Sequence, residues 1–281
     1  MIDTGLAGKI AIVTGGNHGI GAACARALAA QGCGVLVQYL RLPESATHGA
    51  SDAYRISRGQ DAELVLAAIR SAGGRAEAVE ADLSDPATVP LLFDRAEAAL
   101  GPVSILINNA AHWEPDTLLP EPKDAPGPAA WPPRSRPVSA GSLDRHFAVN
   151  ARAPALLMAE FARRHAARGV DWGRISNLST DSADCFPGET GYGASKAALE
   201  SLSRTAAVEL GPLGITVNVI SPGPIQTDWM TPELEAAIAL GTPLRRAGRP
   251  DDIADVAVFL ASHQARWITG HIVRVGGGHR V

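Results

Sequence analysis

Hydrophobic positions along the chain fall into two alternating patterns. Short apolar runs rich in β-branched residues alternate with longer Ala- and Leu-rich stretches whose apolar positions recur at the helical period. The runs predict strands at Lys9–Thr14, Gly34–Tyr39, Ala76–Glu80, Ser104–Asn108, Arg174–Ser179, Ile215–Ile220 and Ile272–Val275. The stretches predict helices near Gly19–Gln31, Gln60–Ala72, Pro86–Leu100, Leu143–Arg168, Gly191–Leu210 and Pro250–Ala261.

The predicted strands are apolar throughout and do not alternate with polar residues. This pattern is typical of a parallel sheet that is covered by helices on both faces. Alternating strands and helices with right-handed crossovers then predict a three-layer α/β/α, Rossmann-type doubly wound sheet. No shift in composition marks a second domain, so residues 1–281 are expected to form a single dinucleotide-binding and catalytic domain.

Two segments lack either pattern. Leu42–Gly59 is polar and contains Gly and Ser, so we expect a loose connection there. Pro115–Gly141 is rich in proline, which excludes a regular element over its length. It is either a lid or wall over a substrate pocket, or a tolerated surface insertion.

Composition narrows the function classes. The chain has 281 residues, of which 46% are hydrophobic and 19% charged, with a net charge of −4 and no basic run, so nucleic acid is not an expected partner. Cys24, Cys33 and Cys185 have no metal-ligand or disulfide spacing, so we expect no metal and a reducing compartment. The N-terminus does not resemble a signal peptide, and no apolar stretch approaches the ~18 residues that span a bilayer. A cytoplasmic protein without a membrane partner is expected.

A glycine cluster follows the first predicted strand. The sequence runs Thr14-Gly15-Gly16-Asn17-His18-Gly19-Ile20-Gly21 directly into a helix. Glycines let the backbone approach a pyrophosphate, and the free N–H groups of a helix N-terminus attract its charge. An ordinary turn gives similar letters, but the position between a first strand and a helix favours dinucleotide binding.

The choice of nicotinamide cofactor depends on the end of the second strand. A carboxylate there would bind the ribose 2′-hydroxyl of NAD(H), whereas an Arg would bind the 2′-phosphate of NADP(H). The chain reads Val37-Gln38-Tyr39-Leu40-Arg41, and Arg41 can make bidentate contacts to phosphate. NADP(H) is therefore favoured, NAD(H) remains possible, and His18 would contribute only when protonated.

Other strand ends complete a crevice. Asp82 and Leu83 follow the third strand, and Asn109 and Ala110 follow the fourth. Ligands of open α/β sheets bind at the carboxyl ends of the strands. We therefore expect these residues beside the glycine loop.

A candidate reacting centre follows the fifth strand. Tyr192 and Lys196 are four residues apart at a predicted helix start, so both lie on one helix face. A free phenol has a pKa of ~10, and a neighbouring ammonium together with a positive nicotinamide would favour phenolate and bring the pKa into the working range. Ser179, at the end of the preceding strand, could hold a substrate oxygen while Tyr192 exchanges its proton.

Taken together, these motifs resemble the short-chain dehydrogenase/reductase family over roughly Leu6 to Gly278. The resemblance also includes Asn150 and the run Ser221-Pro222-Gly223-Pro224-Ile225-Gln226-Thr227. It implies a seven-stranded sheet, a homo-oligomer (dimer or tetramer), and a catalytic set of Asn150, Ser179, Tyr192 and Lys196. It also implies that Tyr192, Lys196, Pro222, Gly223, Ile225 and Thr227 contact the cofactor, with Lys196 on the nicotinamide ribose and Asn150 holding a relay water.

Within the family, the chain is most similar to 3-oxoacyl-thioester reductases, although the Pro-rich insertion has no counterpart in shorter members. The resemblance thus implies a ketoreductase that acts on a small carbonyl or alcohol. Pocket walls are expected from Trp113, Asp181, Phe186, Trp229 and Met230. Two other classes remain open: a non-catalytic nucleotide-binding regulator of the same fold, and a glycine-loop methyltransferase that binds S-adenosylmethionine.

Overall fold

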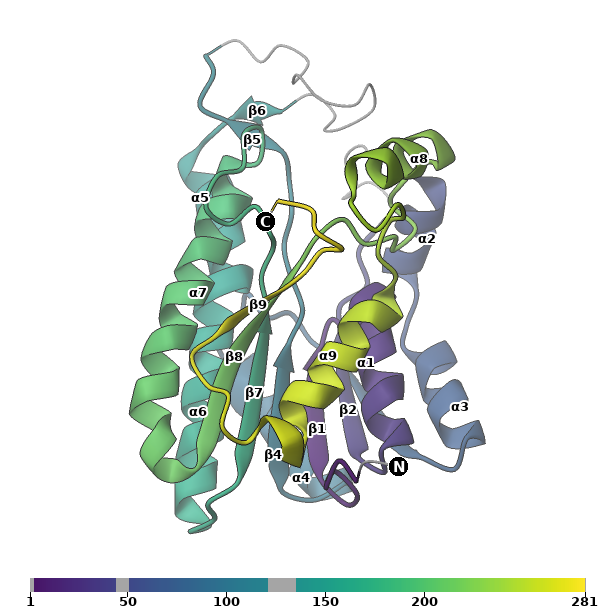
Figure 1. The fold of residues 1–281 in the computed structure, drawn as a ribbon. Coiled ribbons are helices and arrows are strands. Elements are labelled where there is room, and N and C mark those ends of the chain that lie inside the picture. The colour runs from purple at the N-terminus through teal and green to yellow at the C-terminus, as the bar shows by residue number, and fades with distance from the viewer. Residues whose placement is uncertain (1–2, 44–50, 121–134, 281) are drawn as a thin grey trace.

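A parallel sheet of seven strands forms the centre of the computed structural model, which describes residues 3–43, 51–120 and 135–280 (Figure 1). The strands are β1 (Ile10–Thr14), β2 (Gly34–Tyr39), β3 (Arg75–Glu80), β4 (Val103–Asn108), β7 (Gly173–Leu178), β8 (Ile215–Pro222) and β9 (Ile272–Val275). Their order is β3-β2-β1-β4-β7-β8-β9. This doubly wound arrangement confirms the predicted fold class.

Helices cover both faces of the sheet and enclose two separate cores. One core lies under α1 (Gly19–Ala30), α3 (Glu63–Ser71) and α9 (Pro250–Ala261), and the other under α4 (Thr88–Ala99), α6 (Ala153–Ala167) and α7 (Thr190–Leu210). Successive strand residues point to opposite faces. Ala11 and Val13 of β1 therefore enter the first core, whereas Ile10 and Ile12 enter the second.

The helix predicted at Leu143–Arg168 consists of three consecutive segments. α5 (Ala140–Phe147) continues into a π-helical turn, η2 (Ala148–Arg152), and then into α6. Single π-turns inside helices are frequent at functional sites. This turn carries Asn150, whose side chain is buried.

The segment Leu42–Gly59 is not a loose connection over its whole length. Residues Asp52–Gly59 form α2, and the Ser51 hydroxyl caps this helix by accepting from the Tyr54 N–H at 3.1 Å. Residues 44–50 lie outside the described part of the chain. The prediction of a loop is wrong for the second half of this segment.

The two described ends of the Pro-rich segment pair with each other, and the first end contacts α5 and α7. β5 (Asp116–Thr117) pairs with β6 (Arg136–Pro137), while residues 121–134 are outside the described ranges. The Asp116 carboxylate accepts from the Gly191 N–H at 2.7 Å and from the Ser142 hydroxyl at 3.0 Å. The start of the segment therefore holds the first turn of α7 against α5.

The remaining elements are α8 (Pro232–Gly241) and two short 3-10 turns, η3 (Gly211–Leu213) and η4 (His263–Ala265). Figure 1 shows α2 and α8 together beyond the carboxyl ends of the strands, opposite α5 and the β5–β6 pair. Among the helices that the structure describes, none has the length and apolar character to cross a membrane.

Candidate active site

A cleft of about 390 Å³ opens at the carboxyl ends of β1 to β4. Of the residues expected to bind a cofactor, those that line it are Gly15, Asn17, His18, Gly19, Ile20, Asp82, Leu83, Asn109, Ala110 and Thr227. Gly21, Arg41, Tyr192, Lys196, Pro222, Gly223 and Ile225 are not among the lining residues. The sequence reasoning missed Tyr54, Arg58, His112, Arg145 and Val149, which do line it.

The glycine loop at the floor of this cleft has a backbone that only glycine fits. Gly15 has a φ of +61°, and a Cβ on Gly21 would lie 2.1 Å from the Gly15 carbonyl oxygen. Asn109 holds the loop from below, because its amide donates to the carbonyls of Thr14 and Gly15 at 2.9 and 3.0 Å. No side chain caps the α1 N-terminus, so its N–H groups face the cleft as a site for an anion.

The adenosine end of the cleft differs from the sequence expectation. Arg41 is ion-paired with Glu80, with 2.6 Å between Nη2 and Oε2. The pair spans neighbouring strands, since Tyr39 lies opposite Glu80 in the β2–β3 register. Burial, followed by the positive charge of Arg58, lowers the pKa of His18 to about 4. His18 is therefore neutral at pH 7 and supplies no charge to a phosphate.

Asn150 is locked in place by its neighbours. Its Oδ1 accepts from the His112 N–H at 2.7 Å, and its Nδ2 donates to the His112 carbonyl and the Ser195 hydroxyl, both at 2.9 Å. Ser195 in turn donates to the Tyr192 carbonyl at 2.7 Å. The structure thus joins the π-helical turn to the start of α7.

Lys196 lies one helical turn after Tyr192. Its Nζ is 5.7 Å from the centroid of the Tyr192 ring and donates to the Leu178 carbonyl at 2.6 Å. Burial lowers the pKa of Lys196 to about 8, and the nearby Glu200 carboxylate partly opposes this shift. The ammonium is therefore close to its titration range at physiological pH.

Tyr192 is surrounded by side chains that keep its phenol protonated. Burial raises the pKa of Tyr192 well above the ordinary value, and Glu189, Tyr54 and Asp181 add to the rise in that order. Burial thus outweighs the effect of the ammonium that the sequence analysis emphasised. A protonated phenol at neutral pH is an acid, able to donate to a substrate oxygen.

Ser179 contacts a residue that sequence reasoning did not identify. Its hydroxyl donates to the Glu200 carboxylate at 2.6 Å, and both residues are buried. Tyr192, Lys196 and Glu200 follow one another at intervals of four along α7, so all three share a helix face. This spacing is the signal that could have identified Glu200.

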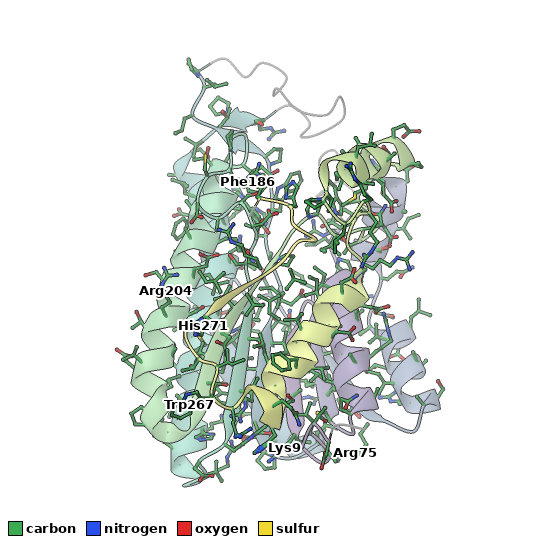
Figure 2. The ribbon with its side chains drawn as sticks, viewed as in Figure 1. Lys9, Arg75, Phe186, Arg204, Trp267 and His271 are labelled. Atoms are coloured by element: carbon green, nitrogen blue, oxygen red, sulfur yellow. The ribbon has the colours of Figure 1, made fainter. Side chains whose placement is uncertain are left out.

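The expected pocket walls divide into two groups. Near Tyr192, the Phe186 ring lies 6.0 Å from the phenol ring. Phe186 is at the end of the molecule opposite to Lys9 and Arg75 (Figure 2). Asp181 is paired with His279 at 2.5 Å.

The remaining three are held by other contacts. Trp113 Nε1 donates to Glu189 at 2.5 Å, and Trp229 Nε1 donates to the Ile225 carbonyl at 2.7 Å. Met230 packs in a small core with Leu234. Within residues 3–43, 51–120 and 135–280, no cluster of His, Cys, Asp and Glu could hold a metal ion.

Comparisons with known proteins place the chain in a family of reductases and oxidoreductases. The family model described as enoyl-(acyl carrier protein) reductase matches residues 15–280. The chain is 38% identical over 273 residues to the uncharacterized oxidoreductase YjdA of Bacillus subtilis, covering 96% of each. It is 36% identical to the NADPH-dependent aldehyde reductase-like protein of Arabidopsis thaliana chloroplasts, covering 98% of this chain and 95% of that protein.

The chain is also similar to the solved structure of a reductase. The promiscuous reductase LugOII, described as catalysing keto-reduction at C1 during lugdunomycin biosynthesis, has a TM-score of 0.79 and 34% identity. The match covers 98% of this chain and 99% of that one.

Proposed function

Since the chain belongs to the short-chain dehydrogenase/reductase family, we propose that it is an NADP(H)-dependent reductase of small aldehydes or ketones. The resemblance implies the reaction class, and the relative from Arabidopsis thaliana is named as an NADPH-dependent aldehyde reductase-like protein. The placement of Lys196 beside Tyr192 adds support from the site itself.

The residues present fit a dinucleotide. The uncapped α1 N-terminus offers free N–H groups to a pyrophosphate, and Gly15 and Gly21 let the loop pack closely against Asn109 beneath it, because a Cβ on either would clash with neighbouring protein atoms. Asp82 and Leu83 would flank the adenine, while Asn109 and Ala110 would lie under the central part. Lys196, Pro222, Gly223, Ile225 and Thr227 would hold the nicotinamide half. When bound, the nicotinamide supplies the hydride.

The side chains of the reacting centre move and hold protons. Tyr192 donates its phenolic proton to the oxygen of the reduced carbonyl, and Lys196 stabilises the phenolate that results. Asn150 is fixed by three hydrogen bonds. It would hold the water that passes a proton on to Tyr192 and Lys196. Ser179 positions the substrate oxygen, and its hydrogen must leave Glu200 to donate to a carbonyl.

The observation that carries the proposal is the placement of Lys196 beside Tyr192, with Nζ 5.7 Å from the centroid of the Tyr192 ring. Because burial and three nearby groups hold the pKa of Tyr192 above the ordinary value, the phenol enters the reaction as an acid. Carbonyl reduction consumes a proton, whereas alcohol oxidation needs a base. Tyr192 with Lys196 beside it therefore suits the role of proton donor in a carbonyl reduction.

Tyr192→Phe tests the proposal. The variant should lower kcat for aldehyde or ketone reduction by at least ~100-fold, because it lacks the proton donor, while the Kd for NADPH stays within about twofold. Turnover is followed by NADPH absorbance, and Kd by quenching of tryptophan fluorescence. Unchanged turnover would remove Tyr192 from the mechanism. Tight S-adenosylmethionine binding without nicotinamide binding would support a methyltransferase, and nicotinamide binding without turnover a regulator.

We further propose that the protein works as a homo-oligomer in the cytoplasm. Large apolar side chains support assembly. Trp267, which follows α9, is 95% exposed (Figure 2), and Val208 on α7 is 79% exposed. Light scattering after size exclusion tests this, and a monomeric mass at micromolar concentration would contradict it.

A further inference from the structure

α2 forms one wall of the adenosine end of the cleft. Tyr54 and Arg58 line this end together with His18, Gln38 and Leu40. The Tyr54 ring meets the His18 ring edge-on at 6.1 Å, and the Arg58 guanidinium lies over the Tyr54 ring at 5.5 Å. Arg58 therefore stands beside the loop that would hold the adenosine phosphates.

Polar contacts tie both ends of α2 to the site. At its start, Ser51 donates to the carbonyl of Asp228. In its last turn, Ser57 donates to the Asp228 carboxylate at 3.3 Å. At its end, the Arg58 carbonyl accepts from the Leu42 N–H at 3.1 Å. The Gln60 carbonyl accepts from the amide of Asn17, in the glycine loop, at 2.9 Å. These contacts hold Arg58 at a fixed place relative to the glycine loop.

Among the residues that the structure describes at this end of the cleft, Arg58 is the cation that remains available to a phosphate. Arg41 is engaged by Glu80 through Nη2 at 2.6 Å and through Nε at 3.0 Å to both carboxylate oxygens. His18 is neutral, because burial and Arg58 lower its pKa to about 4. The negative charge of Asp228 acts on His18 in the opposite direction to Arg58, and the Asp228 carboxylate accepts a hydrogen bond from Ser57 at 3.3 Å. In the described part of the chain, no carboxylate forms an ion pair with Arg58.

We propose that Arg58 on α2, and not Arg41, is the side chain that recognises the 2′-phosphate of NADP(H). This inference rests on the proposed function. A guanidinium keeps its charge at every physiological pH and offers a planar fork that matches phosphate oxygens. The Tyr54 ring supports the guanidinium plane, and α2 carries both residues to the cleft. Arg41 instead stabilises the β2–β3 edge through Glu80.

The experiment compares matched substitutions at the two arginines. Arg58→Gln and Arg41→Gln remove the same charge from neighbouring places and keep hydrogen-bonding capacity. Isothermal titration measures Kd for NADPH, NADH, 2′,5′-ADP and 5′-AMP, so that the 2′-phosphate is the only difference within each pair. Arg58→Gln should weaken NADPH and 2′,5′-ADP by about 10- to 100-fold and leave NADH and 5′-AMP within about twofold. Arg41→Gln should leave all four within about twofold.

Three further measurements separate loss of the phosphate contact from loss of structure. Arg58→Lys should recover only part of the affinity for NADPH, because an ammonium lacks the fork. Circular dichroism should show that the variants keep the fold, since α2 contributes no fully buried residue. The loss in Arg58→Gln should also shrink at high salt, because the contact is partly exposed.

The possible failures are distinguishable. Equal affinity of wild type and Arg58→Gln for 2′,5′-ADP, with NADPH still preferred by the wild type, overturns this inference alone. The same holds if Arg41→Gln carries the loss, or if Arg58→Gln weakens NADH as much as NADPH. A wild type that binds NADH more tightly than NADPH overturns the proposed NADP(H) preference itself, and the role of Arg58 with it.

Discussion

The hydrogen bond between Ser179 and Glu200 predicts that Ser179→Ala changes stability as well as catalysis. The hydroxyl donates at 2.6 Å to a carboxylate, and the two residues are only 5% and 7% exposed. A hydrogen bond to a charged group contributes about 1.5–3 kcal/mol, and its loss leaves a buried acceptor without its donor. Ser179→Ala should therefore lower the free energy of unfolding by about 1.5–3 kcal/mol.

A double-mutant cycle separates this interaction from other effects. Glu200→Gln removes the charge, and the Ser179→Ala/Glu200→Gln double variant should lose less stability than the sum of the single variants, by about 1–2 kcal/mol. Urea unfolding of the ligand-free protein, followed by circular dichroism, measures each value. Ser201→Ala, an exposed position on α7, is the matched control and should stay within about 0.5 kcal/mol of wild type.

The same variants report on catalysis. If Glu200 holds the Ser179 hydrogen in the resting site, Glu200→Gln should alter kcat for carbonyl reduction while leaving the Kd for NADPH nearly unchanged. Additive losses in the cycle, or a loss below about 0.5 kcal/mol for Ser179→Ala, would refute the idea that this bond is strong.

Three other outcomes are expected. Gly21→Ala should abolish nucleotide binding in fluorescence titrations and cost about 1–3 kcal/mol in urea unfolding, because its Cβ would lie 2.1 Å from the Gly15 carbonyl oxygen; normal NADPH affinity would contradict this. Lys196 has a folded-state pKa of about 8, below its unfolded value, so the unfolded chain binds more protons between about pH 8 and 10.5 and stability rises with pH there. The stability advantage of Lys196→Met over wild type should thus be largest below pH 8 and shrink toward pH 10.5, and a constant difference across that window would argue against the assigned shift. Burial raises the pKa of the Cys24 and Cys33 thiols to about 12, so iodoacetamide at pH 8 should label Cys185 alone in the native protein, as peptide mass mapping can show.

Local signals were sufficient for the sheet and for the floor of the cleft. The apolar run before Thr14 and the glycines after it specify β1, the tight turn and α1, because burial and backbone freedom act within a few residues. The spacing from Ser179 to Tyr192 and Lys196 likewise follows from one strand end and one helix turn.

The position of α2 at the adenosine end of the cleft could not be predicted from the local sequence. α2 has no fully buried residue, so none of its side chains belongs to a core, and its place depends on contacts with Asp228, which lies 171 positions after Ser57. The pairing of Arg41 with Glu80 depends on the neighbouring strand, because β2 and β3 pair in parallel and Tyr39 lies opposite Glu80 at their ends. The residues around β2 alone do not reveal that Arg41 has a partner in Glu80.

The division of the interior by the sheet has a consequence for protein engineering. Sequence neighbours such as Ile12 and Val13 belong to different cores, whereas Leu28 and Leu260, far apart in the chain, belong to the same one. Substitutions drawn from opposite faces share few side-chain contacts, so their effects should add, while those within one face should interact. A stabilised variant is therefore best assembled from two independently selected libraries, one for each face, joined in a single cloning step.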